Sequence, residues 1–286
     1  MDDERDEAGA TYQRVWSELL SLLADGTYPL GSRLPSQREL ANEFQVSRDT
    51  MQKVLRKLVA EGWISSPQGR GIRVTREPSA LSSPGGRRAS LGEFMDKAFD
   101  NPEVTLDVSA LTAESLAFQV RRQDERIRDG RHLVLRRITL RMLLPAEDLA
   151  AQVYPRAVND EDNAAVWQRH LDITRMSTAD IKSKIHGLRS DRLVPDVDIE
   201  IRRARFTPTL MLYLINNSAV LAAPYVPVRR PVYLTAHDKA VEAIDVLSIG
   251  ATFAYDAKDD DPHSPATEKV DNWRKWFNAT WDLTAQ

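Results

Sequence analysis

Four polar side chains that can form hydrogen bonds lie between positions 48 and 56: Arg48, Asp49, Gln52 and Arg56. At about 100° per residue, a helix through this segment places all of them on one side. Arginine can pair with guanine, glutamine with adenine, and aspartate can accept a hydrogen bond from cytosine. Such a helix in a major groove could read a base sequence. A solvated helix face, with Asp49 only favouring the helix N-terminus, is the alternative.

Two short helices joined by a tight turn are predicted to position these side chains. Ser36 and Glu39 have the spacing of a capping box, which marks the start of the first helix. Ser47 caps the second helix, and Gly62 marks its end. Apolar residues recur in both helices at three- and four-residue steps and predict a shared core: Leu40, Ala41, Phe44, Met51, Val54, Leu55, Leu58 and Val59. A further amphipathic helix is expected over residues 11–24.

A β-hairpin is predicted directly after the second helix. Residues 63–66 and 72–75 are short strand-like runs, and residues 67–71 between them contain two glycines that permit a turn. A basic hairpin that follows a polar-faced helix is typical of the wing of a winged helix. The hairpin therefore favours the DNA-reading interpretation over the solvated face.

Residues 12–76 resemble the winged-helix domain of the GntR family of bacterial transcription regulators. The resemblance is carried by four separate blocks, residues 31–41, 46–50, 58–64 and 69–74. It implies that residues before and within the first helix contact phosphates or bases, that the second helix enters the major groove and that the hairpin tip enters the minor groove. The resemblance and the polar helix face together give the expected DNA-contacting residues: Arg33, Ser36, Arg38, Ser47, Arg48, Asp49, Thr50, Gln52, Arg56, Gln68, Gly69 and Arg70. Many relatives carry arginine where this chain has Gln52, which bears on the operator sequence.

Charge and composition agree with this interpretation. The whole chain has a formal charge of −3, but residues 26–76 contain nine Lys or Arg against four Asp or Glu, a local charge of +5. The chain has no cysteine, which excludes disulfides and thiolate ligands and suits a reducing cytoplasm. The acidic residues 1–7 do not resemble a signal peptide, and no run of about 20 apolar residues could span a membrane. We expect a cytoplasmic protein without a membrane partner.

The expected organisation is multidomain. An N-terminal α+β winged helix-turn-helix over residues 10–76 is followed by a flexible linker over residues 77–90, which is rich in Pro, Ser and Gly. Residues 91–286 are expected to form one C-terminal α/β domain for effector sensing and dimerisation. A length of 286 residues agrees with two domains.

A βαβ unit is predicted at the start of the C-terminal region. It consists of a strand at 104–108, a helix at 113–128 and a strand at 136–144, which implies parallel pairing with a right-handed crossover. Further strands are expected at 198–206, 210–216, 219–226 and 243–249, and helices at 163–171, 177–188 and 268–282. This pattern does not fit the all-helical effector domain common in GntR regulators. The antiparallel effector domain of another subfamily fits better, although a helix at 113–128 between two strands is not its usual start. The region resembles one half of a phospholipase D-like α/β fold.

An enzymatic role is not supported by the residues. The phospholipase D signature is His-x-Lys followed by four residues and Asp, whereas here Asp245 lies one residue too far after His237 and Lys239, and there is one copy. The five histidines are scattered without the spacing of a metal site, and no cofactor is expected. Residues 259–261 are three aspartates, interpreted as a solvated loop with a cation site as the alternative.

An effector pocket is predicted from arginines at strand ends and tyrosines that could stack on a ring: Arg203, Arg205, Tyr213, Tyr225 and Arg229. The alternative is plain alternation, with the arginines facing water. Near the C-terminus, apolar aromatic residues at helical spacing predict either packing on the sheet or a subunit interface: Trp273, Trp276, Phe277 and Trp281.

The sequence thus predicts a homodimeric transcription regulator, which we expect to repress transcription. Its partners would be a near-palindromic double-stranded DNA operator and an unknown small-molecule effector, because a dimer doubles the few base pairs that one winged helix reads. Two alternatives remain. One is a DNA-tethered phosphodiesterase-like enzyme, and the other is a DNA-binding protein without an effector.

Overall fold

The computed structural model describes residues 11–284 apart from gaps at 13–14, 17–18, 21, 24–27, 29–30, 68–70, 76–90, 131–134, 149–152, 235–238 and 247–252. The chain divides into two compact units. The first unit comprises Met1–Ala80, Tyr154–Met176 and Pro227–Ala251, and the second comprises Leu81–Val153, Ser177–Val226 and Thr252–Gln286. This division differs from the expected one, which placed all of residues 91–286 in one C-terminal domain. The expected linker at 77–90 lies outside the described residues.

The first unit contains the predicted helix-turn-helix and hairpin. Its elements are α2 (Gln37–Glu43), α3 (Arg48–Ala60), β1 (Ile64–Ser65) and β2 (Arg73–Val74), and β1 pairs antiparallel with β2. The capping box is confirmed: the Glu39 amide donates to Ser36 Oγ (3.3 Å), and the Ser36 amide donates to Glu39 Oε2 (2.7 Å). Ser47 Oγ accepts from the Thr50 amide (3.1 Å), so both helices begin where the sequence predicts.

The core of the winged helix is formed by apolar side chains of the helical residues between 11 and 23, of α2 and α3, and of the hairpin. Its largest fully buried members include Trp16, Leu40, Met51 and Trp63. The prediction was wrong for Val59, whose side chain is 42% exposed. Val59 lies about 100° beyond Leu58 around the helix, at the edge of the buried stripe.

A three-stranded antiparallel sheet and the first half of α6 complete the first unit. The strands are β5 (Arg156–Ala157), β9 (Pro227–Leu234) and β10 (Lys239–Val246), in the order β5-β10-β9. The predicted strand at 243–249 coincides with β10 only as far as Val246, and its last residues lie outside the described part. β9 was not predicted as a strand. It contains Pro227 and Pro231, and it lies at a sheet edge, where proline is tolerated.

The second unit is built on a six-stranded mixed sheet in the order β11-β8-β7-β3-β4-β6. The strands β3, β4 and β6 run parallel, and the remaining neighbours pair antiparallel. This confirms the predicted βαβ unit and the α/β class of this region. The strand bounds are β3 Glu103–Ser109, β4 Arg137–Pro145, β6 Asp196–Ala204, β7 Leu210–Ile215, β8 Ala219–Pro224 and β11 Ala254–Ala257.

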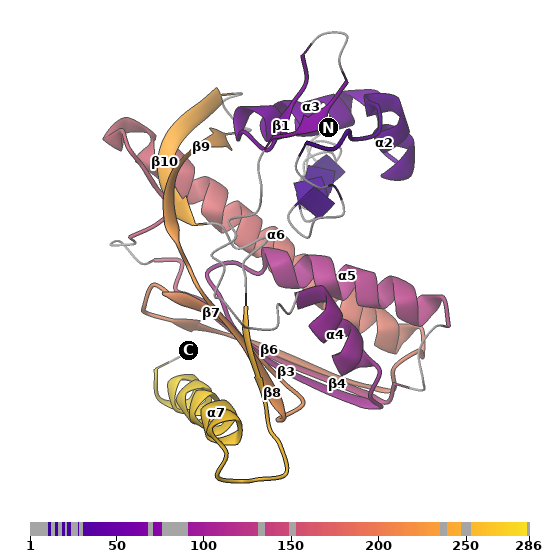
Figure 1. Cartoon of the computed structure of the whole chain (residues 1–286), viewed down its shortest axis with the longest axis vertical. Helices are drawn as coiled ribbons and strands as arrows, with labels where there is room; N and C mark the ends of the chain where they lie inside the picture. The colour runs from indigo at the N-terminus through magenta and orange to yellow at the C-terminus, as the bar shows by residue number, and fades with distance from the viewer. Residues whose placement is uncertain are drawn as a thin grey trace. The chain divides into compact units, whose positions relative to one another are not determined.

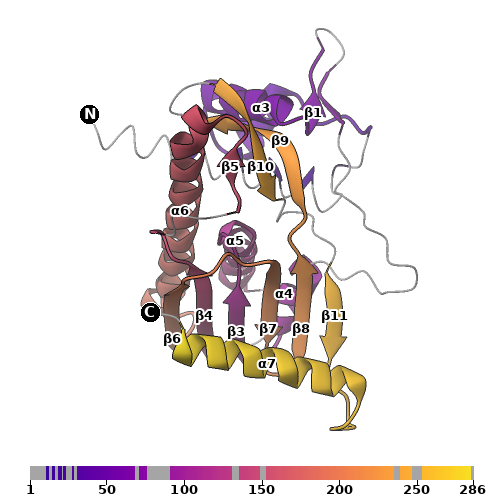
Figure 2. The ribbon, with the colours of Figure 1, turned by 90° about the vertical axis from the view of Figure 1, so that its left-hand side faces the viewer.

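Helices cover both faces of this sheet. Figures 1 and 2 show α4 (Leu91–Phe99) and α5 (Glu114–Arg128) on one face and α7 (Pro265–Leu283) across the other. The two helices predicted at 163–171 and 177–188 are one helix, α6 (Asn163–Ser190), because no proline or glycine interrupts the segment before Gly187. By residue range, α6 contributes its first half to the first unit and its second half to the second.

The aromatic residues of α7 pack on the sheet. Phe277 and Trp281 are buried in a cluster with Leu143, Leu212 and Leu214. Sheet packing therefore accounts for these two side chains. Trp276 is 37% exposed and meets the ring of Phe206 edge to face.

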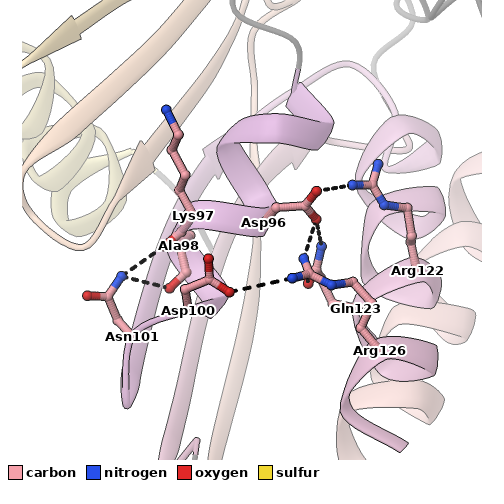
Figure 3. Close-up of polar contacts among 8 residues, drawn as sticks. All are labelled: Asp96, Lys97, Ala98, Asp100, Asn101, Arg122, Gln123 and Arg126. Carbon is pink, nitrogen blue, oxygen red and sulfur yellow. Dashed lines mark hydrogen bonds and ion pairs between the residues drawn. The ribbon is translucent and has the colours of Figure 1, made fainter. Parts of the chain in front are cut away.

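A polar cluster joins α4 to α5 within the second unit (Figure 3). Asp96 on α4 accepts hydrogen bonds from Arg122, Gln123 and Arg126 on α5. Arg126 also pairs with Asp100 (3.5 Å). None of the helices in the described residues has the length and apolar content needed to cross a bilayer.

Candidate nucleic-acid interface

A groove of about 650 Å³ lies between the start of α2, the exposed side of α3 and the hairpin. It brings together four of the predicted DNA-contacting residues: Arg33, Ser36, Gln52 and Arg56. Its floor is apolar, with Leu34, Leu55, Val59 and Ile72, and the partial exposure of Val59 follows from this position. The polar residues converge from separate segments of the chain on one concave surface.

The position of α3 is fixed at its N-terminus. Gln37 Nε2 on α2 donates to the main-chain carbonyl of Arg48 (3.0 Å), which joins the two helices across the turn. Ser47 Oγ and Thr50 Oγ1 lie 2.9 Å apart, so both hydroxyls take part in the cap. Gln37 was not among the predicted residues, because its partner lies 11 residues away and nothing in the local pattern identifies it.

The predicted reading face of α3 is open to solvent. The exposed residues on it are Arg48, Asp49, Gln52 and Arg56, while Thr50 is half-buried. Arg33 and Arg38 are exposed at and before α2, as is Ser36. Apart from Thr50, the residues predicted to contact DNA that the structure describes are exposed and not part of the protein core.

The hairpin gains a third segment that places Arg33 beside it. Arg33 forms a β-bridge with Arg73, the Leu34 amide donates to the Ile72 carbonyl (3.0 Å), and the Val74 amide donates to the Ser32 carbonyl (3.1 Å). Arg73 Nη1 donates to the carbonyl of Gly31 (3.0 Å), so this guanidinium holds the segment in place. The predicted minor-groove residues Gln68, Gly69 and Arg70 lie outside the described residues.

One of the basic residues counted toward the charge of this region is not on the surface. Lys57 is 1% exposed, and its Nζ lies 3.4 Å from the centre of the Trp16 ring, a cation–π contact. It lies on the side of α3 opposite the reading face. Lys57 therefore does not contribute a surface charge to DNA.

The predicted effector residues do not form one cluster. Arg203 and Arg205 line a cavity of about 360 Å³ in the second unit, but Arg203 pairs with Glu147 (2.8 Å) and Arg205 with Asp148 (3.1 Å) in the same cavity. An anion would have to compete with these carboxylates. Arg229 belongs to the first unit and pairs with Glu242 (3.4 Å).

The two predicted tyrosines of the effector pocket are packed in the second unit. Tyr213 is 1% exposed and meets Phe253 edge to face, and burial raises the pKa of its phenol above the ordinary value. Tyr225 is buried, and its hydroxyl accepts a hydrogen bond from the Leu111 amide (2.7 Å). Neither ring is presented to solvent for stacking.

The residues considered for catalysis or metal binding do not assemble in the part of the chain that the structure describes. No three His, Asp or Glu side chains there gather as a metal-ligand set, and His237 lies outside the described residues. Asp259 serves the start of α7: its Oδ1 accepts from the Asp261 amide (3.0 Å). A hydrogen bond with Ser264 holds the pKa of Asp259 below its ordinary value.

A capped helix-turn-helix followed by a two-stranded wing defines a winged-helix DNA-binding domain. Residues 11–74 match the family model described as bacterial regulatory proteins, gntR family. This segment is therefore a GntR-family helix-turn-helix domain, and the resemblance found in the sequence is confirmed.

The known relatives are similar over the same segment. An arabinose metabolism transcriptional repressor from Geobacillus stearothermophilus is 37% identical over 65 residues, which are 23% of this chain and 18% of the relative. A probable fructoselysine utilization operon transcriptional repressor from Escherichia coli strain K12 is 38% identical over 63 residues, 22% of this chain and 26% of the relative. The chain thus spans about a quarter or less of the length of these two relatives. Both are named as transcriptional repressors.

A solved structure titled as mutant ORR3 in complex with the NTD of AraR is also similar. It is 34% identical, with 23% of this chain and 93% of that chain covered and a TM-score of 0.22.

Proposed function

We propose that this protein is a sequence-specific DNA-binding transcription regulator that acts as a repressor. The observation that carries the proposal is the groove beside α3, where Arg33, Ser36, Gln52 and Arg56 converge next to the solvent-exposed Arg48. Arginine and glutamine on an exposed helix face are the side chains that pair with guanine and adenine in a major groove. Two relatives of residues 11–74 are named as transcriptional repressors, which supports repression over activation.

The second part of the proposal concerns assembly and control. Two copies of the chain would bind a near-palindromic operator as a homodimer, because one α3 helix reads only a few base pairs. The α/β sheet of the second unit would bind a small-molecule effector in the cytoplasm, and its cavity with Arg203 and Arg205 is the proposed place. Because the cavity also contains Glu147 and Asp148, it supports a ligand that carries both a positively and a negatively charged group.

The test is a binding measurement with the full chain. Its affinity for DNA upstream of its own coding region, and for fragments selected from a genomic library, is compared with that for random DNA of equal length at about 150 mM salt. A specific regulator is expected to prefer its site by roughly a thousandfold or more and to protect a near-palindrome. Equal affinity for every selected fragment and for random DNA would refute sequence-specific regulation.

A further inference from the structure

The C-terminal end of α3 carries a buried carboxylate. Glu61 is the C-cap residue of α3, and its side chain is 0% exposed. Burial of a charge is costly, and a negative charge at a helix C-terminus is opposed by the helix dipole. Glu61 is therefore tolerated only with cations beside it.

Those cations come from segments far along the chain but within the same compact unit. Arg230 Nη1 on β9 lies 3.1 Å from Glu61 Oε2, and Arg169 Nη2 on α6 lies 3.6 Å from Glu61 Oε1. Arg230 Nη2 also pairs with Asp245 Oδ2 on β10 (2.5 Å). Two arginines and two carboxylates thus balance, and we refer to Glu61, Arg169, Arg230 and Asp245 as the buried ion network.

Arg230 is the centre of this network. Its side chain is 8% exposed. Burial lowers the pKa of its guanidinium, but the charges of Asp245 and Glu61 outweigh burial, so the pKa is raised and the group stays charged. Its planar fork pairs with Glu61 through Nη1 and with Asp245 through Nη2.

The network lies on the side of α3 opposite the DNA-reading face. Lys57, one turn before Glu61, is buried against Trp16, and the guanidinium of Arg169 lies 5.8 Å from the centre of the same ring. α3 packs against β9 here, as Figures 1 and 2 show. One face of α3 therefore reaches solvent and the groove, while the other is held by charges from β9, β10 and α6.

We infer that Arg230 is a positioning residue for DNA binding. Through Glu61 it fixes the end of α3 on the paired strands β9 and β10, and this sets the orientation in which α3 presents Arg48, Gln52 and Arg56. A ligand or partner that displaces these two strands changes operator affinity through the Glu61–Arg230 pair. The inference rests on the proposed function, because it assumes that α3 reads an operator.

The experiment uses the full chain and variants that neutralise one charge at a time: Arg230→Gln, Glu61→Gln and the double variant. The matched control is Arg229→Gln, the next residue on the same strand, whose pair with Glu242 is at the surface with the arginine side chain 67% exposed. Affinities for operator and random DNA are measured by fluorescence anisotropy, and the folded fraction is measured by circular dichroism. Arg230→Lys, which keeps the charge, is the conservative variant.

We expect Arg230→Gln and Glu61→Gln each to lower operator affinity about tenfold while affinity for random DNA changes less than about twofold. The double variant is expected to lose less than the product of the two single losses, because the two residues act through one pair. Arg230→Lys should recover part of the loss, and Arg229→Gln should bind as the wild type does.

The inference is overturned if the variants melt earlier but bind operator with wild-type affinity once the folded fraction is taken into account. It is also overturned if operator and random DNA lose affinity equally. If Arg230→Gln does not fold, the operator and random-DNA affinities of Glu61→Gln decide by the same criteria. A wild-type chain that prefers no operator would instead refute the proposed function, so the two failures are distinguishable.

Discussion

The substitution Arg48→Ala tests the reading face of α3 most directly. Arg48 is the first residue of α3, its side chain is exposed, and the hydrogen bond from Gln37 uses only its main-chain carbonyl. Removal of the side chain therefore leaves the cap and the core intact. A positive charge at a helix N-terminus is slightly unfavourable, so the free energy of unfolding should stay the same or rise by a few tenths of a kcal/mol.

The effect on DNA binding should be much larger than the effect on stability. A bidentate contact from arginine to a guanine is worth about 1–3 kcal/mol, which corresponds to roughly a 5- to 150-fold loss of operator affinity. The matched control is Arg189→Ala, an exposed arginine in the last turn of α6 with the same change in charge. The control should keep its operator affinity.

Fluorescence anisotropy titrations at several salt concentrations separate the two kinds of contact. A base contact lowers affinity for the operator but not for random DNA, whereas a phosphate contact lowers both and reduces the salt slope by about one. Unchanged operator affinity would refute the assignment of Arg48 to DNA. An equal loss on both DNAs would refute its role in sequence reading.

Three further predictions concern stability. Ser36→Ala should lower the free energy of unfolding by about 1 kcal/mol through loss of the capping box, measured by urea titration; an unchanged midpoint would contradict it. Hydrogen bonds with the backbone of Ser36, and to a lesser extent with its side chain, hold the pKa of Glu39 below its ordinary value. The stabilisation of the folded state by Glu39 is therefore present above the unfolded-state pKa and is lost as pH falls through the folded-state pKa. Glu39→Gln should therefore weaken the loss of stability in acid, and an unaltered pH profile would count against this. Asp107→Ala should lower the free energy of unfolding by about 3–5 kcal/mol, because the Asp107 side chain is 3% exposed and accepts hydrogen bonds from Nε and Nη2 of Arg141. The control Asp148→Ala breaks an exposed ion pair and should lower it by at most about 1 kcal/mol. Equal melting temperatures of the two variants would contradict the value for Asp107.

The features that the sequence predicted correctly depend on short-range patterns. The capping box at Ser36, the two helices of the winged helix and the exposed polar face at 48–56 follow from spacing along one helix. The βαβ unit follows in the same way, because two apolar strands flank an amphipathic helix and chain geometry favours parallel pairing. Each pattern lies within a few turns or one crossover.

Other elements were predicted incompletely. Continuous α6 was predicted as two helices, although its sequence has no helix breaker between the two parts, so its continuity follows from local sequence. β9 was not predicted as a strand, and its place at a sheet edge is what accommodates its two prolines. The predicted effector residues show the same limit, since the sequence gives arginines but not the carboxylates, Glu147 and Asp148, that already pair with two of them.

The sequence by itself determined the DNA-binding domain, because its caps, apolar stripes and reading face are local and each residue type follows from its own helix position. Only the tertiary structure decided that Lys57 and Glu61, which look like ordinary surface charges on α3, are buried. The physical reason is that burial of a charge depends on a partner, and the partners of Glu61 are Arg169 and Arg230, more than 100 residues away in the chain. Spacing along a helix carries no information about a counter-charge that folding brings from elsewhere.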